Sequence, residues 1–139
     1  MNEIIIPVKK PELFYQYLTY INPLLNLKDR ERQVLGALIS LKYTYKDRYL
    51  PKQLDEFIFS ESTYNQLAKR YDSTPKAIEK NIEALKEKHC ILKDPKSDRV
   101  IIHPNRLKFY QEDKFKLTLT FVIKKEDEKE SKEERKVSL

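Results

Sequence analysis

Apolar residues recur at helical spacing in the first part of the chain. Between 11 and 21 the apolar positions fall at i, i+1, i+4, i+5 and i+8, and they are Leu13, Phe14, Tyr17, Leu18 and Ile21. This spacing predicts an amphipathic helix, and Pro11 is tolerated in its first turn. We expect Asn22-Pro23 to end the helix, because the residue before a proline is pushed away from helical geometry.

A second helix is predicted over residues 28–42. Its apolar face consists of Val34, Leu35, Leu38, Ile39 and Leu41, again at helical spacing. The following stretch, 43–59, is aromatic and irregular and contains Pro51. Within it, residues 54–59 fit either a short helical turn or an edge strand, and the pattern does not choose between them.

Two short helices joined by a tight turn are predicted next, over residues 62–71 and 75–88. Ser60 or Ser62 is a suitable N-cap for the first. Thr74 caps the second, and Pro75 stands at its first position, where a missing N–H costs nothing. The inward positions of this pair are Leu67, Ala68, Ile78, Ile82 and Leu85. The small Ala68 favours a close, steep crossing of the two helices.

The last part of the chain favours strands and then a charged tail. Turn formers between 94 and 98 separate Ile91-Leu92 from β-branched residues 100–102, which predicts a β-hairpin over 91–103. Residues 115–123 alternate between apolar and polar before turning wholly apolar, which predicts a strand. Residues 125–139 are rich in charge and are expected to be disordered in isolation.

The order helix, helix, helix, hairpin over about residues 27–103 resembles the winged helix-turn-helix superfamily of DNA-binding proteins. The resemblance implies a mainly α (α+β) fold with a three-helix core and a β-hairpin wing, to which an N-terminal extra helix and a C-terminal strand are added. The domains expected are an N-terminal helical extension (1–26), the winged helix-turn-helix domain (27–108), a C-terminal strand extension (109–124) and a flexible tail (125–139). Related families commonly have a glycine near Asp72, where the backbone needs a positive φ that Asp adopts more readily than most residues.

The positive charge of the chain falls mainly on the same region. The net charge is +6, and residues 63–108 carry 11 basic and 6 acidic side chains. A local excess of basic groups attracts polyanions. The competing interpretation is an ordinary solvated surface, since the excess is spread over 46 residues.

The resemblance implies which residues meet DNA. Recognition helices present their N-terminal half to base edges, so the base-contact candidates are Thr74, Lys76, Ala77, Lys80 and Asn81. The phosphate-contact candidates come from the supporting helix and the wing, and they are Tyr64, Lys69, Arg70, Lys93, Lys96 and Arg99. Glu83 and Glu87 lie on the exposed side of the second helix and are unfavourable near phosphate, so we expect DNA entry by its first two turns, or no entry at all.

Several classes of function are disfavoured by composition. A single cysteine, Cys90, permits neither a disulfide nor a four-ligand zinc site within one chain. We expect Cys90 in the core and His89 as a cap or surface group. With one glycine, no glycine-rich phosphate loop is possible. We therefore predict no cofactor, no metal and no enzymatic activity. No apolar run reaches the ~20 residues that span a bilayer and no secretion signal is apparent, so we expect a cytoplasmic protein, or one in host cytoplasm or virion if phage-encoded.

Two functions follow. The first is a sequence-specific double-stranded DNA-binding protein, a small transcriptional regulator or replication protein of a bacterium, phage or mobile element. The second is a non-enzymatic protein-interaction or assembly module of a virion or complex, built on the same fold. A homodimer or protein contact through helix 11–21 or strand 115–123 is compatible with both.

Overall fold

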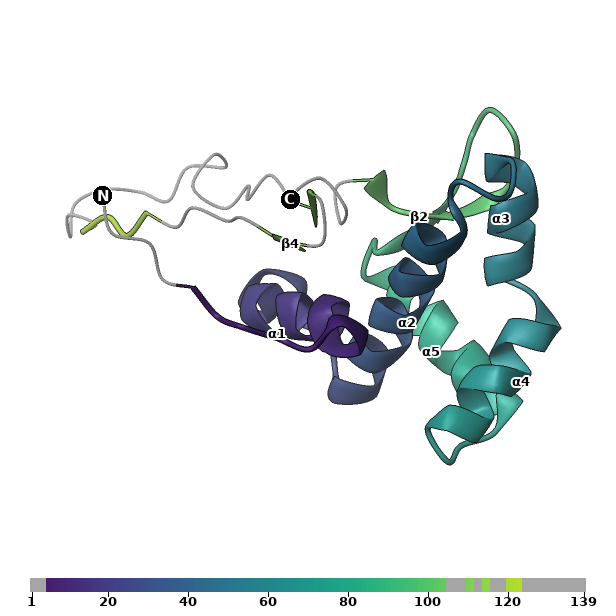
Figure 1. The fold of residues 1–139 in the computed structure, drawn as a ribbon. Coiled ribbons are helices and arrows are strands. Elements are labelled where there is room, and N and C mark those ends of the chain that lie inside the picture. The colour runs from purple at the N-terminus through teal and green to yellow at the C-terminus, as the bar shows by residue number, and fades with distance from the viewer. Residues whose placement is uncertain (1–4, 105–109, 112–113, 116–119, 124–139) are drawn as a thin grey trace.

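The protein is mainly helical. The structure, a computed structural model, describes residues 5–104, 110–111, 114–115 and 120–123. Its elements, apart from a short 3-10 helix at Lys10–Glu12, are α1 (Leu13–Leu25), α2 (Asp29–Tyr45), α3 (Pro51–Ile58), α4 (Glu61–Arg70), α5 (Pro75–Glu87), β1 (Ile91–Lys93), β2 (Val100–Ile102), β3 (Tyr110–Gln111) and β4 (Lys114–Phe115) (Figure 1). β1 and β2 form an antiparallel pair with Ile91 opposite Ile102.

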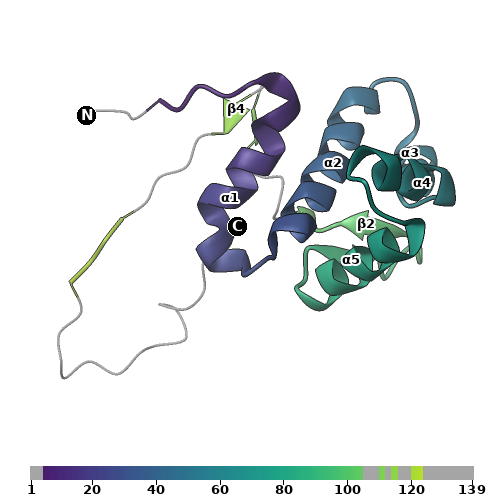
Figure 2. The same ribbon diagram turned by 90° about the horizontal axis from the view of Figure 1, so that it is seen from below.

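The core is built around α2. Val34, Leu35, Leu38 and Ile39 of this helix are fully buried. Figure 2 shows α1 on one side of α2 and α3, α4 and α5 on the other. Buried side chains from α1 through β2 join one hydrophobic cluster, so α1 shares its core with the helices that follow. At about 25 cal/mol per Å² of buried apolar surface, such a cluster is the main source of folding free energy.

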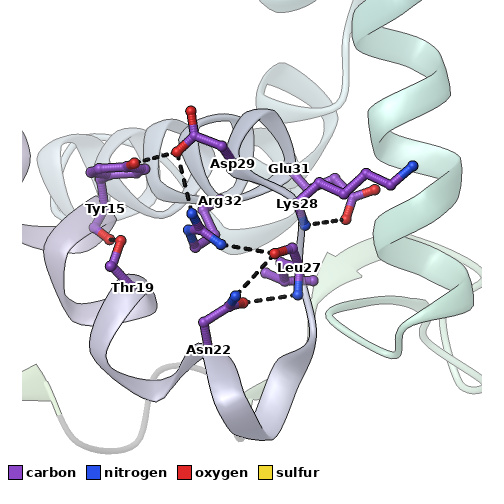
Figure 3. Close-up of polar contacts among 8 residues, drawn as sticks. All are labelled: Tyr15, Thr19, Asn22, Leu27, Lys28, Asp29, Glu31 and Arg32. Atoms are coloured by element: carbon purple, nitrogen blue, oxygen red, sulfur yellow. Dashed lines mark hydrogen bonds and ion pairs between the residues drawn. The ribbon is translucent and has the colours of Figure 1, made fainter.

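The expectation that Asn22-Pro23 ends the first helix is wrong. α1 continues through Pro23 to Leu25, and Asn26 ends it in left-handed geometry with φ 55° and its N–H bonded to the Asn22 carbonyl at 2.7 Å. The Asn22 side chain also bonds the N–H (2.8 Å) and the carbonyl (3.0 Å) of Leu27 (Figure 3). The added turn buries Leu25, and this burial and the new hydrogen bonds offset the backbone bond that Pro23 cannot make.

Polar contacts fix α1 against the start of α2. The Tyr15 hydroxyl donates to the Asp29 carboxylate (Figure 3), and the Arg32 guanidinium donates to the Leu27 carbonyl at 2.8 Å. Farther along α2, Gly36 faces the backbone of α1: a Cβ there would lie 3.1 Å from the backbone nitrogen of Tyr15. The single glycine of the chain thus permits the close approach of the two helices.

Residues 54–59, for which the sequence allowed a helical turn or an edge strand, belong mostly to α3. Pro51 is the first residue of this helix, a position that proline favours. Leu54 and Ile58, one turn apart, are both buried. The segment is therefore helical rather than an edge strand, because helical spacing is what carries both side chains into the core.

The predicted strand over 115–123 is confirmed at one end only. Phe115 belongs to β4, which pairs with β3 in a sheet separate from β1 and β2. Residues 120–123 form no regular structure, and Phe121, Val122 and Ile123 are exposed, so the strand prediction is wrong there. Residues 116–119 and the predicted tail 125–139 lie outside the described residues. Within the described part of the chain, no helix combines the length and apolarity needed to cross a membrane.

Replacing Gly36 with valine tests the close approach of α1 and α2. We expect Gly36→Val to lower the free energy of unfolding by about 1–3 kcal/mol, the usual penalty of overpacking, although valine forms helices better than glycine. Thr44→Val on the exposed part of α2 is the matched control, with a change within about 0.5 kcal/mol. Urea unfolding measures both, and a Gly36→Val protein as stable as the wild type would contradict the close approach.

Candidate nucleic-acid interface

α4 and the turn after it follow the predicted geometry. The Ser60 hydroxyl accepts the Thr63 N–H at 3.3 Å, so Ser60 rather than Ser62 is the N-cap. After Arg70 the chain turns sharply, with Asp72 at φ 51° and the Ser73 N–H bonded to the Ala68 carbonyl at 2.7 Å. The expected positive φ at Asp72 is confirmed.

α5 begins and packs as the sequence predicts. The Thr74 hydroxyl accepts the Ala77 N–H at 3.1 Å, and Pro75 is the first helical residue. The inward positions Ile78, Ile82 and Leu85 are buried. Because one side of α5 is held by the core, the opposite side is presented to solvent.

A buried ion pair holds the far end of α5. Nζ of Lys88 lies 2.7 Å from Oε1 of Glu31 in the first turn of α2, and the same oxygen accepts the Lys28 N–H at 2.9 Å. Burial by itself raises the pKa of Glu31, but the hydrogen bonds from Lys88 and Lys28 and their positive charges hold this pKa below its ordinary value of 4.5. The charged carboxylate therefore stabilises the contact between α5 and α2.

The end of α5 is also as expected. His89 takes left-handed geometry at φ 61°, and the Cys90 N–H bonds the Leu85 carbonyl at 2.9 Å, a common way to end a helix. The Cys90 side chain is buried and His89 is exposed. Among the described residues, no group of three or more His, Cys, Asp or Glu is arranged to hold a metal ion.

The base-contact candidates lie together on the exposed side of α5. Thr74, Lys76 and Lys80 are exposed, and Ala77 and Asn81 are partly exposed. In the described part of the chain, no carboxylate oxygen lies within 4.0 Å of the ammonium of Lys76 or Lys80. Both charges are therefore available to a ligand.

The depression along this side of α5 is balanced in charge. An open depression runs along α5, and its lining residues are Tyr64, Lys76, Glu79, Lys80, Ile82, Glu83, Ala84, Lys86 and Glu87. Lys86 is paired with Glu83 at 3.1 Å. The lining thus holds three lysines and three glutamates, and the two lysines without an ion pair belong to the first two turns.

Tyr64 lies in a less favourable place for a phosphate than its sequence position suggests. It is half-buried, and burial first, then the nearby carboxylates of Glu79 and Glu83, raise the pKa of its hydroxyl. The same two carboxylates would repel a phosphate brought to Tyr64.

The three cations of the hairpin differ in what they contact. Lys93 pairs with Asp98 at 3.1 Å on the surface. The guanidinium of Arg99 lies 3.2 Å from Oδ2 of Asp55 in α3 and is mostly buried, so it ties the hairpin to the helical core. Lys96 is exposed and has no carboxylate within 4.0 Å among the described residues. It is the hairpin cation best placed for a phosphate.

Asp55 carries the opposite pKa shift to Glu31. Burial raises the pKa of Asp55 above its ordinary value of 3.8, and the nearby charges of Lys42 and Arg99 do not fully offset this effect. The folded protein therefore disfavours the charged form of Asp55 relative to water, despite the contact with Arg99.

One cation near the turn was not a candidate in the sequence. Arg30, the second residue of α2, places its guanidinium 5.2 Å from the centre of the Tyr71 ring, and that of Arg70 lies 5.4 Å from the same centre. Lys69, the neighbour of Arg70 in α4, is exposed. No spacing along the chain could connect Arg30 to Tyr71, since 41 positions separate them and only the tertiary fold brings Tyr71 to α2.

Comparisons with protein-family models, with curated proteins and with solved structures give no match for this chain. The function proposed below therefore rests on the geometry of the chain itself.

The two buried carboxylates should respond oppositely to substitution. A lowered folded-state pKa stabilises the protein above the ordinary pKa, and this contribution is lost as the pH falls; a raised one stabilises it at low pH, and that contribution is lost as the pH rises. At pH 7 we expect Glu31→Gln to lower the free energy of unfolding by about 1–3 kcal/mol, as for a lost hydrogen bond to a charged group, and Asp55→Asn to cause no loss or a small gain.

Urea unfolding between pH 3 and pH 7 checks both variants. The stability that Glu31→Gln loses relative to the wild type should shrink as the pH falls below about 4.5. Any stability that Asp55→Asn gains over the wild type should also shrink at low pH, because Asp55 is then protonated in the wild type. Equal destabilisation by both substitutions at pH 7 would contradict the assigned pKa directions.

Proposed function

We propose that the protein is a sequence-specific double-stranded DNA-binding protein of the winged helix-turn-helix type. The observation that carries the proposal is the pair Lys76 and Lys80. Both ammonium groups are exposed and without a carboxylate partner within 4.0 Å among the described residues, in the first two turns of a helix whose other side is buried. A helix held in this way can enter the major groove with its N-terminal half.

The arrangement around α5 supports this assignment. α2, α4 and α5 supply the three helices of the core, with α3 inserted between the first two, and the β1–β2 hairpin follows α5 directly. The hairpin is anchored to α3 by Arg99 and Asp55, which leaves its exposed Lys96 in a defined place. Lysine reaches guanine acceptors in the major groove and Asn81 can pair with adenine, each good contact contributing ~1–3 kcal/mol of discrimination.

The charges predict how a duplex would be oriented. Glu83 and Glu87 in the second half of α5 disfavour phosphate, while Lys76 and Lys80 in the first half favour it. We infer entry by the first two turns only, with Lys69, Arg70 and Lys96 contacting phosphates. A small transcriptional regulator or a replication protein fits a chain with this interface.

A duplex-binding titration at several salt concentrations tests the proposal. We expect log K to fall linearly with log salt concentration, because phosphate contacts release counterions. Lys76→Ala and Lys80→Ala should change the preferred sequence, whereas Lys96→Ala should weaken all duplexes alike and reduce the slope by about 1. Lys9→Ala, an exposed lysine before α1, is the control and should change neither affinity nor preference.

A protein-interaction or assembly module is the second candidate, and one observation favours it. Tyr49, Leu50 and Phe57 near the junction of α2 and α3 are exposed apolar residues, as are Phe121, Val122 and Ile123. The rings of Tyr49 and Phe57 both lie against that of Tyr45, so these two form an exposed apolar cluster of the kind that marks interaction sites. The absence of binding to any duplex at low salt would remove the DNA proposal and leave this candidate, for which Tyr49→Ser and Leu50→Ser should weaken self-association in sedimentation experiments.

A further inference from the structure

Tyr71 is a meeting point of two arginines from different helices. It follows α4 directly, and the guanidinium carbons of Arg30 and Arg70 lie 5.2 Å and 5.4 Å from the centre of its ring. Contacts of this kind place a cation within about 6 Å of an aromatic ring centre, where the charge attracts the π electrons. One ring therefore positions two guanidinium groups that sequence order keeps 40 residues apart.

The ring itself is fixed. Its hydroxyl donates to the backbone carbonyl of Gln33 in α2 at 3.2 Å, and the side chain is partly buried. Burial raises the pKa of Tyr71, and the charges of Arg70 and Arg30 act in the opposite direction, as expected for two cations facing one phenol. Tyr71 thus forms a platform held by α2 and α4 together.

The positive charge at this platform is not neutralised by the parts of the protein that the structure describes. No carboxylate oxygen of the described residues lies within 4.0 Å of the guanidinium of Arg30 or Arg70. Because both groups lie over one ring, their charges are at most about 11 Å apart, roughly a Debye length at 0.1 M salt. Two like charges this close together raise the positive potential around Tyr71 and attract an anion to it.

We propose that Arg30 and Arg70 form a clamp for a single phosphate group of the DNA backbone, with Tyr71 as the platform that positions them. The proposal rests on the function proposed above. The planar fork of a guanidinium matches phosphate oxygens and donates two parallel hydrogen bonds to them. Arg30 is thereby a DNA contact from α2, a helix outside the α4–α5 pair.

The location of the clamp suits a duplex that meets α5. Tyr71 precedes Thr74 by three residues, so their Cα atoms are at most ~11 Å apart. The major groove is about 12 Å wide. When the start of α5 lies in the groove, a strand of the bordering backbone therefore comes within reach of the two arginines.

The test is a salt-dependent titration of a duplex with the full chain and matched variants. Arg30→Gln and Arg70→Gln should each lower the slope of log K against log salt by about 1, because each abolishes the same phosphate contact. The double variant should lower it by about 1 as well, rather than 2. Arg30→Lys and Arg70→Lys should keep the slope while weakening binding severalfold, since lysine keeps the charge but lacks the fork.

The control is Arg48→Gln, which removes an exposed arginine lying 5.7 Å from the ring centre of Tyr45, and it should leave the slope unchanged. Thermal unfolding of each variant identifies losses of duplex affinity that come from misfolding. Where a Gln variant is unstable, the Lys variant of the same residue still tests the clamp, because it should weaken duplex binding severalfold at an unchanged slope.

Three results would overturn the clamp. If the wild type binds duplex but Arg30→Gln and Arg70→Gln behave like Arg48→Gln, the clamp is wrong and the proposed function stands. If 10 mM inorganic phosphate at constant ionic strength displaces the duplex from the wild type but not from Arg30→Gln or Arg70→Gln, the site serves a free phosphate. If no duplex is bound at low salt, the clamp and the proposed function fail together.

Discussion

The burial of α2 on both sides is the constraint on which the rest of the structure depends. Four of its apolar side chains are fully excluded from water, and Gly36 lets the α1 backbone approach to a distance at which a Cβ would be 3.1 Å away. A helix packed from both sides cannot shift or rotate without opening cavities. Two polar contacts tie α5 and the turn before it to this helix: Glu31 binds Lys88, and the Gln33 carbonyl binds Tyr71.

Two buried carboxylates complete the frame in different ways. Glu31 accepts hydrogen bonds from Lys88 and from the Lys28 N–H, and it is more stable charged than in water. Asp55 is the reverse, because burial outweighs the charges that face it. A carboxylate whose charged form is destabilised by burial adds little stability, so the contact of Asp55 with Arg99 is better understood as fixing the direction of the hairpin than as holding the fold together.

Local signals along the chain predicted the local structure well. The Thr74 cap, Pro75, the positive φ of Asp72 and the turn formers between 94 and 98 each act through a few neighbouring residues, and each of these predictions is confirmed. The errors came where tertiary packing overrode a local rule. Pro23 lies inside α1 because burial of Leu25 outweighs one missing backbone bond. Arg30 was missed because its partner ring is distant in sequence.

The positions of the charges bear on which helices would provide affinity for DNA and which would provide sequence specificity. The exposed side of α5 was predicted correctly from helical periodicity, yet its charges nearly cancel along the whole helix, so α5 by itself attracts a polyanion weakly. Five cations that make no ion pair among the described residues, Arg30, Lys69, Arg70, Lys76 and Lys80, instead lie on the first turn of α2, the end of α4 and the start of α5. Attraction to phosphate falls with salt and is indifferent to sequence, whereas contacts to base edges discriminate. In the proposed complex with DNA, the cations of these three helices would supply the affinity, and the first two turns of α5 would supply the choice of sequence.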